Sequence, residues 1–239
     1  MNPDKMIKRL ELNGIPYEPG VPEKLVIYFR LLKEWNSRMD LTSVPEDDEI
    51  IDRHFIDSLL ILKTKLITKD SSLIDVGTGA GFPGMVLAIA RKDLKVTLAD
   101  SQQKRLNFLE EVRIETGSEN IDLLHMRAED AAKKEAYREK FDFATARALA
   151  PLNVLCEYLL PFVKVGGYAL CWKGPSLQKE IESGRRAATM LGGRVKQSFN
   201  CPVAGREWNH VILPIQKDKK TPDPYPRKAG IPKNKPLGQ

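Results

Sequence analysis

The chain of 239 residues has few of the side chains that build metal centres or disulfide frameworks. Its three cysteines and three histidines are scattered without the short spacings of metal ligands, so we expect no metal site and a reducing compartment. No apolar run approaches the roughly 18 residues of a membrane span, and the first residues lack the pattern of a signal peptide. We therefore expect a cytoplasmic protein that does not enter a membrane.

A buried strand, a glycine-rich turn and a helix start follow one another over residues 73–84. The stretch reads Leu-Ile-Asp-Val-Gly-Thr-Gly-Ala-Gly-Phe-Pro-Gly. Positive φ angles at Gly77, Gly79 and Gly81 would let backbone amides approach a nucleotide-like ligand. Pro83 suits the first turn of the next helix, whose free N–H groups favour an anionic ligand group.

Two nucleotide-binding patterns overlap in this turn. Residues 79–84 match the dinucleotide pattern G-x-G-x-x-G, and residues 75–81 match D-x-G-x-G-x-G, which looks like the first motif of S-adenosyl-L-methionine (AdoMet) methyltransferases. The apolar run ends at Val76, so the dinucleotide register would begin two residues late. The Asp75 carboxylate could meet the ammonium of AdoMet, a group that NAD(P) lacks. We favour AdoMet, which yields S-adenosyl-L-homocysteine, and keep NAD(P) as the alternative.

Apolar spacing predicts helices over residues 1–68 and then an alternation of strands and helices. Strands are predicted near 72–76, 94–99, 120–126, 142–146 and 167–173, and helices near 83–91, 102–117, 129–139, 151–164 and 175–191. The alternation requires a parallel sheet with right-handed crossovers. The last two strands, near 194–200 and 208–215, are joined too briefly for a crossover helix and should pair as a hairpin.

This pattern predicts an α/β, Rossmann-like class I AdoMet methyltransferase fold. The sheet should be mostly parallel and seven-stranded, with an antiparallel edge strand. We divide the chain into an N-terminal helical extension (1–68), a methyltransferase domain (69–216) and a basic, proline-rich C-terminal tail (217–239).

Ligands of such sheets bind at the carboxyl ends of the strands, and this rule selects further residues. Asp100 ends the second strand and could accept hydrogen bonds from ribose hydroxyls or cap the next helix. Ala128 and Glu129 follow the third strand, where an adenine ring would lie, although Glu129 could instead serve the helix dipole. Phe82 would pack on the ligand or hold the helix start.

The fourth strand ends at Arg147, which is always charged and cannot act as a base. It could stack on a base, pair with a phosphate, hold a cofactor carboxylate or form a salt bridge with an acid such as Asp142. Guanine N7 has a free lone pair and carries no proton, so it can attack a sulfonium methyl without a general base. In-line positioning is then the main requirement. The residues fit that reaction without uniquely implying it.

The C-terminal tail carries seven Lys and Arg against two Asp, and it holds five prolines. Such a segment cannot bury enough apolar surface to fold alone. It is either a solvated, mobile tail or an arm that binds nucleic-acid phosphates. In the second case its removal should weaken RNA binding and leave cofactor affinity unchanged.

Nearly the whole chain resembles the RsmG family (glucose-inhibited division protein B), bacterial methyltransferases that modify guanine N7 in 16S (small-subunit) ribosomal RNA. The stretches that carry the resemblance are Trp35-Asn36, Leu41-Thr42, Arg53–Leu59, Asp75–Gly84, Lys104-Arg105, Phe108-Leu109, Arg127–Glu129, Ala146–Ala148 and Arg227–Leu237. The resemblance implies AdoMet contacts at Gly77, Phe82, Ala128, Glu129 and Arg147. It also implies RNA contacts at Arg105, Lys173, Arg227 and Lys228, with Arg147 and His54 as positioning residues.

We therefore predict an AdoMet-dependent rRNA guanine-N7 methyltransferase, monomeric, that acts on 16S ribosomal RNA or a small-subunit particle. One alternative is a small-molecule methyltransferase whose residues 1–68 close over the substrate. Another is a nucleic-acid- or ribosome-binding module with a non-catalytic AdoMet site.

Overall fold

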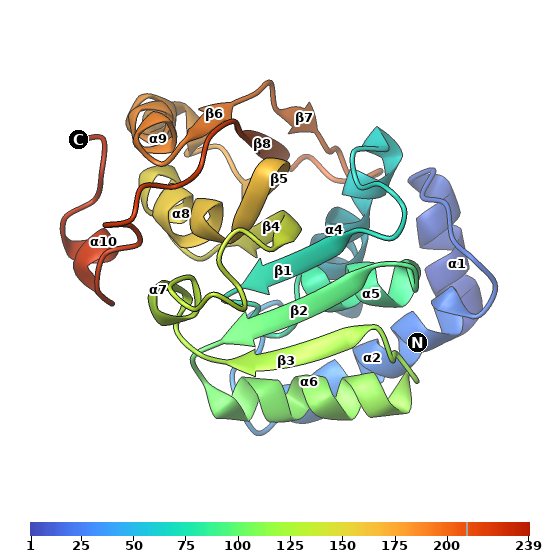
Figure 1. The fold of residues 1–239 in the computed structure, drawn as a ribbon. Coiled ribbons are helices and arrows are strands. Elements are labelled where there is room, and N and C mark those ends of the chain that lie inside the picture. Colours follow the sequence, from blue (N-terminus) through green and yellow to red (C-terminus); the bar gives the residue numbers. More distant parts are fainter. Residues whose placement is uncertain (209) are drawn as a thin grey trace.

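A sheet with the strand order β3-β2-β1-β4-β5-β8-β6 forms the middle layer of the computed structural model, which describes residues 1–208 and 210–239 (Figure 1). The strands are β1 (Ser72–Val76), β2 (Lys95–Asp100), β3 (Ile121–His125), β4 (Phe141–Arg147), β5 (Val163–Lys173), β6 (Gly193–Val195), β7 (Phe199–Asn200) and β8 (Val211–Lys217). Strands β1 to β5 are parallel, and β8 runs antiparallel to β5. The predicted fold class is confirmed.

The antiparallel strand is not at the edge of the sheet, and that part of the prediction is corrected. Strand β8 lies between β5 and the two short strands β6 and β7, into which the predicted strand 194–200 divides. The apolar side chains of β8 are buried, whereas Lys196 and Gln197 between β6 and β7 are exposed. A polar, interrupted strand suits an edge position, and a continuous apolar strand suits the interior.

Helices cover both faces of the sheet (Figure 1). They are α1 (Pro3–Leu12), α2 (Val21–Asn36), α3 (Asp47–Ile50), the π-helix η1 (Ile51–Ile56), α4 (Asp57–Leu59), the 3-10 helix η2 (Leu60–Thr64), α5 (Gly84–Ala90), α6 (Gln103–Glu115), α7 (Ala128–Ala131), α8 (Leu152–Leu159), the 3-10 helix η3 (Leu160–Phe162), α9 (Leu177–Met190) and α10 (Ile231–Asn234). No helix in the described part of the chain is long and apolar enough to cross a bilayer.

Alternate side chains of the strands point into two separate cores, as the period of two requires. In β1, Leu73 packs with the N-terminal helices, α5 and α6, while Ile74 packs with α8 and α9. The predicted helix 129–139 is wrong in length, because α7 ends at Ala131. The residues that follow are mostly charged and exposed, so a longer helix would have no apolar face to bury.

The N-terminal helices reach the glycine turn directly. The hydroxyl of Tyr28, on α2, donates a hydrogen bond to the backbone oxygen of Ala80. The Tyr28 ring also stacks on Phe82, with 5.4 Å between ring centroids, and Phe55 meets Phe82 edge-on. Phe82 therefore holds the turn against the N-terminal helices.

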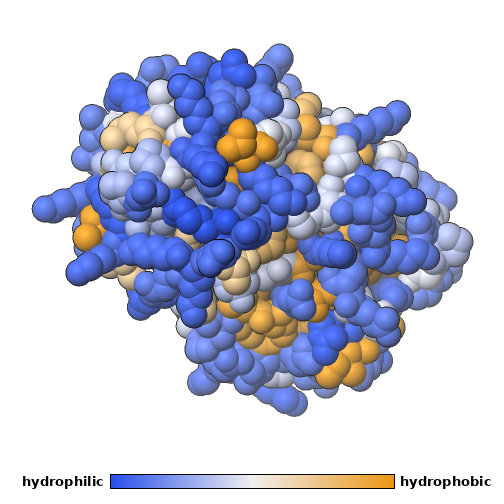
Figure 2. Space-filling model, viewed as in Figure 1, coloured by the Kyte–Doolittle hydropathy of each residue, from blue (hydrophilic) through white to orange (hydrophobic). Residues whose placement is uncertain are grey.

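The basic C-terminal tail is packed against the rest of the protein, which corrects the expectation that it stays unfolded. The Lys217 ammonium, fully buried at the end of β8, donates to the Leu160 oxygen at 2.5 Å and the Thr221 hydroxyl at 2.8 Å, and it pairs with Glu139 at 3.1 Å. Its burial lowers the pKa of Lys217 to about 8. Figure 2 shows that the molecular surface on the side of α10 is largely hydrophilic. Polar anchors, rather than a large apolar face, hold the tail.

We expect Lys217→Met to lower the free energy of unfolding by about 2–4 kcal/mol, because it leaves buried carbonyl oxygens and Glu139 without their partner. Urea unfolding at pH 7 measures the change. The matched control is Lys219→Met, an exposed lysine two residues later, whose effect should stay within about 0.5 kcal/mol. Equal stabilities of the two variants would contradict this role of Lys217.

Candidate active site

Two cavities open on either side of the segment that follows β4. The first, called here the Asp100 cavity, has a volume of about 340 Å³ and lies at the carboxyl ends of β1, β2 and β3. The second, the Arg147 cavity, has a volume of about 350 Å³ and lies between the ends of β4 and β5 and the π-helix η1. Ala148 lines the Arg147 cavity and Leu149 lines the Asp100 cavity, so this short segment separates them.

The glycine turn has the backbone that the sequence predicted. Gly77, Gly79 and Gly81 have φ angles of +65°, +58° and +98°. A Cβ on Gly77 would lie 2.7 Å from Leu149 Cδ1, and one on Gly81 would lie 2.8 Å from Leu109 Cδ2. In front of Gly79 the space is open, with the nearest atom, the Gly77 oxygen, at 3.9 Å. Packing therefore excludes a Cβ at position 81, where buried side chains surround it, whereas a Cβ at 77 would require the exposed Leu149 side chain to move and 79 faces free space.

Asp75 lies behind the turn and lines neither cavity. Its carboxylate is fully buried and accepts hydrogen bonds from the Thr78 hydroxyl at 2.7 Å, the Thr145 hydroxyl at 2.7 Å and the Gly84 N–H at 3.0 Å. Burial raises the pKa of Asp75 to about 6 despite these donors. We expected this carboxylate to meet a cofactor ammonium; in the structure it fixes both ends of the glycine turn instead.

The Asp100 cavity contains several of the predicted cofactor residues. One carboxylate oxygen of Asp100 accepts the Gly79 N–H at 2.9 Å, and the other accepts the Gln102 N–H at the start of α6, also at 2.9 Å. Asp100 therefore lines the cavity and fixes the turn that leads into α6, but it is not the N-cap residue of that helix, which is Gln102. Ala128 and Glu129 line the opposite wall.

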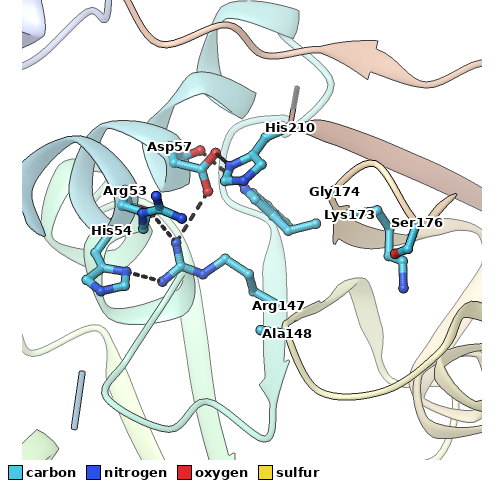
Figure 3. A pocket seen from close by; sticks show the side chains of 10 residues that line it. Arg53, His54, Asp57, Arg147, Ala148, Lys173, Gly174, Ser176 and His210 are labelled. Carbon is cyan, nitrogen blue, oxygen red and sulfur yellow. Dashed lines mark hydrogen bonds and ion pairs between the residues drawn. The ribbon is translucent and has the colours of Figure 1, made fainter. Parts of the chain in front are cut away.

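Arg147 is held on three sides where it enters its cavity (Figure 3). One guanidinium nitrogen donates to the Arg53 backbone oxygen at 2.6 Å and lies 3.3 Å from the Asp57 carboxylate. The other nitrogen lies 2.9 Å from His54 Nδ1. Asp142, the acid that we considered as its partner, instead binds Ser72 at the opposite end of β4.

His54 is a neutral imidazole with both nitrogens occupied. A guanidinium only donates, so His54 Nδ1 accepts from Arg147 and the proton resides on Nε2, which donates to the Thr42 hydroxyl at 2.7 Å. Burial, with Arg147 and Arg53 nearby, lowers the pKa of His54 to about 3. Asn36 accepts the Thr42 N–H at 2.8 Å and so places that hydroxyl. His54 has no free nitrogen with which to serve as a base.

The structure adds a residue that sequence reasoning missed. His210 lines the Arg147 cavity, and its Nδ1 lies 3.0 Å from the Asp57 carboxylate (Figure 3). In a neutral His210 whose Nδ1 donates to Asp57, the other ring nitrogen is a hydrogen-bond acceptor. No spacing pattern could reveal this pair, because the two residues are 153 positions apart in the chain.

A second missed feature is a basic and aromatic ledge beside the same cavity. It consists of Trp208 with the guanidinium of Arg53 4.4 Å above its ring centroid and that of Arg206 at 5.3 Å. The Trp208 ring also stacks with His210 at a centroid distance of 6.0 Å. Indole and guanidinium planes of this kind can stack on nucleobases.

The four residues expected to contact RNA differ in their surroundings. Lys173 lines the Arg147 cavity but pairs with Glu180 at 2.5 Å, and its side chain is 9% exposed. Arg227 pairs with buried Glu157 at 2.6 Å. Arg105 lines the Asp100 cavity, and Lys228 is exposed. Among the residues described, no group of three or more His, Cys, Asp and Glu side chains could hold a metal ion.

His54→Gln should change how stability depends on pH. The folded pKa of His54, about 3, lies below its ordinary 6.5, so between these values the unfolded chain carries the proton and the folded protein does not. Because of His54, the free energy of unfolding of the wild type therefore falls by roughly 1.4 kcal/mol per pH unit as pH falls through that window. Gln keeps an uncharged donor towards Thr42 and does not titrate, so the loss should disappear.

Urea unfolding of both proteins at pH 7, 5.5 and 4.5 measures this difference. Asp75 titrates in both proteins and cancels in the comparison. Parallel stability curves for wild type and variant would show that His54 is not held neutral.

Comparisons with known proteins extend over most of the chain. A family model described as "GidB: rRNA small subunit methyltransferase G" matches residues 22–209. The chain is 46% identical over 224 residues to the "Ribosomal RNA small subunit methyltransferase G" of Alkaliphilus metalliredigens, covering 94% of each chain. It is 43% identical over 234 residues to the protein of the same name from Clostridium perfringens, covering 98% of each.

Solved structures are similar in fold alone, because their sequence identities are low. A SAM-dependent methyltransferase from Aquifex aeolicus matches with a TM-score of 0.52 and 19% identity, over 70% of this chain and 92% of that chain. The AdoMet complex of TYW2 from M. jannaschii matches with a TM-score of 0.51 and 14% identity, over 65% of this chain and 74% of that chain. The family model and the relatives, by contrast, show that the chain belongs to the family of rRNA small subunit methyltransferase G.

Proposed function

We propose that this protein transfers a methyl group from AdoMet to N7 of a guanine in 16S ribosomal RNA. The names of its relatives support the substrate class, and the family resemblance of its sequence supports the position on the base. The observation that carries the proposal is the pair of adjoining cavities at the carboxyl ends of the strands. The Asp100 cavity suits the adenosine of the cofactor, and the Arg147 cavity suits the guanine base of the substrate.

The residues of the Asp100 cavity fit the adenosine part of AdoMet. Its lining includes apolar side chains such as Val76, Met126 and Leu149, against which a purine ring could pack. Carboxylates from Asp100 and Glu129 stand at its walls and can accept hydrogen bonds from ribose hydroxyls and from the adenine amino group. AdoMet would supply an electrophilic methyl group on a sulfonium centre.

The Arg147 cavity fits a guanine. Trp172 gives it an apolar wall, the Arg147 side chain offers N–H donors, and His210 offers an acceptor. Guanine carries an acceptor at O6 and donors at N1 and N2, so these groups match its edges. Arg147 and His210 would orient the base, and Trp172 would hold its plane.

No protein base is needed in this reaction. AdoMet would supply the methyl group and leave as S-adenosyl-L-homocysteine, and N7 would need only its own lone pair to accept the methyl, giving a cationic purine. The chain's part is to hold the base in line and exclude water, which can supply roughly 7–11 kcal/mol. His54 acts on Arg147 only, as a positioning residue, because both of its nitrogens are occupied.

The decisive experiment transfers labelled methyl from AdoMet to ribosomal RNA from a strain that lacks this protein. We expect label in small-subunit RNA and chemical strand scission at one N7-methylguanine. Transfer should fall steeply as salt rises, because phosphate contacts release counterions. Label on a small molecule, with no dependence on salt, would favour the small-molecule methyltransferase, and bound AdoMet without turnover on any RNA would favour the binding module.

Gly79→Val should abolish measurable AdoMet binding, because its branched side chain would enter the open space in front of the turn. The control is Gly117→Val, since Gly117 has nearly the same φ, +56°, also faces open space and lies at the far end of α6, whereas the Gly79 N–H binds Asp100 of the cavity. Both variants carry the backbone strain of a β-branched residue at positive φ, but only the first should lose the cofactor. Calorimetric titration with AdoMet measures it, and retained micromolar affinity in Gly79→Val would refute this placement.

A further inference from the structure

We infer that residues 227–238, called here the C-terminal wall, complete the Asp100 cavity and set the protein's affinity for AdoMet. This inference rests on the proposed function, since it concerns the same cofactor. Gly230 and Lys233 line the Asp100 cavity together with the carboxyl ends of β1, β2 and β3. In Figure 1 the wall, coloured red, carries α10 beside α7 and α8.

The wall is fixed at its beginning by one buried acid. Glu157, on α8, has a side chain that is 1% exposed. Its carboxylate accepts the backbone N–H of Arg227 at 2.8 Å and two guanidinium N–H groups of the same residue at 3.0 and 2.6 Å. Arg227 therefore forms an internal ion pair with Glu157, and its two short guanidinium hydrogen bonds make this a strong, charge-assisted contact.

The far end of the wall is fixed by the two helices beneath it. Asn153, on α8, donates to the Leu237 oxygen at 3.0 Å, and Arg186, on α9, donates to the Gly238 oxygen at 2.8 Å. The Leu237 side chain is buried in the core formed with α8 and α9. With both ends held, the residues between them keep a defined position over the cavity.

The middle of the wall is hydrogen-bonded to Glu129, the residue that we expect beside the adenine. The Gly230 N–H donates to Glu129 Oε1 at 3.0 Å, and Glu129 is otherwise buried at the cavity's edge. Gly230 has a φ of +83°, a left-handed conformation that favours glycine. The wall thus orients a carboxylate of the cavity and also closes one of its sides, whereas a free RNA-binding arm would do neither.

The test compares two cations of the wall that differ in their contacts. Arg227→Met removes the anchor on Glu157, and Lys235→Met removes an exposed charge that lines neither cavity. Calorimetry with S-adenosyl-L-homocysteine and AdoMet gives the affinities. We expect about a tenfold or greater loss for Arg227→Met, the scale of a lost charged hydrogen bond, and no change for Lys235→Met.

A second variant acts without changing a charge. Gly230→Pro removes the N–H that holds Glu129, and proline cannot adopt a positive φ. This variant should therefore lower the affinity for AdoMet and for S-adenosyl-L-homocysteine by a factor similar to that of Arg227→Met. The KM for AdoMet should rise in both wall variants while kcat at saturating AdoMet is kept. A general loss of folding would lower the apparent kcat and leave KM unchanged, and thermal unfolding without ligand identifies it.

Binding to a small-subunit RNA fragment at several salt concentrations separates the wall from an RNA arm. An RNA contact by Arg227 would reduce the salt slope of the Arg227→Met variant by about one, whereas we expect the slope to be unchanged. Cofactor affinity within twofold of wild type in both Arg227→Met and Gly230→Pro would overturn the inference. Wild-type protein that binds neither AdoMet nor S-adenosyl-L-homocysteine would instead overturn the proposed function.

Discussion

The guanidinium of Arg147 ties the end of β4 to the N-terminal helices, at the point where the chain passes between the two cavities. His54, Asp57 and the Arg53 backbone oxygen, all on η1 and the start of α4, receive its donors. Directly after it, Ala148 adopts a φ of +53°, a conformation that costs of order 1 kcal/mol outside glycine. The chain then turns to divide the cavities. A contact between distant parts of the sequence thus lies at the boundary between the two cavities.

Part of the positive charge of this basic protein is paired with carboxylates of its own chain. The sequence has a formal net charge of +6, which alone suggests an RNA partner. Three of its cations, Lys173, Lys217 and Arg227, are engaged with carboxylates of their own chain. The ledge of Arg53, Arg206 and Trp208 beside the Arg147 cavity combines charge with a stacking surface, and its two arginines also pair with acids of their own chain, Glu49 and Asp52.

Local patterns were enough to predict strands β1 to β5, the glycine turn and the place of Asp100 at the end of β2. An apolar run followed by glycines predicts a strand that ends in a tight turn. An alternation of strands and helices predicts a parallel sheet. The position of Asp142 could also have been read correctly, because five residues of strand separate it from Arg147 by roughly 16 Å.

Other features depend on pairings that sequence spacing does not contain. Asp75 meets Thr145 of the neighbouring strand, and His210 meets Asp57 across most of the chain. The tail folds against the protein through single polar anchors such as Arg227 with Glu157, which composition cannot distinguish from solvated charge. Strand β8 is interior because two short strands cover its outer side, and its position therefore depends on how the whole sheet is assembled.

A crystal structure of the protein with S-adenosyl-L-homocysteine tests this arrangement most directly. We expect the adenosine in the Asp100 cavity, between Asp100, Glu129 and the C-terminal wall, with the sulfur directed past Ala148 towards Arg147. A nicotinamide cofactor in that cavity, or S-adenosyl-L-homocysteine bound elsewhere on the protein, would contradict it.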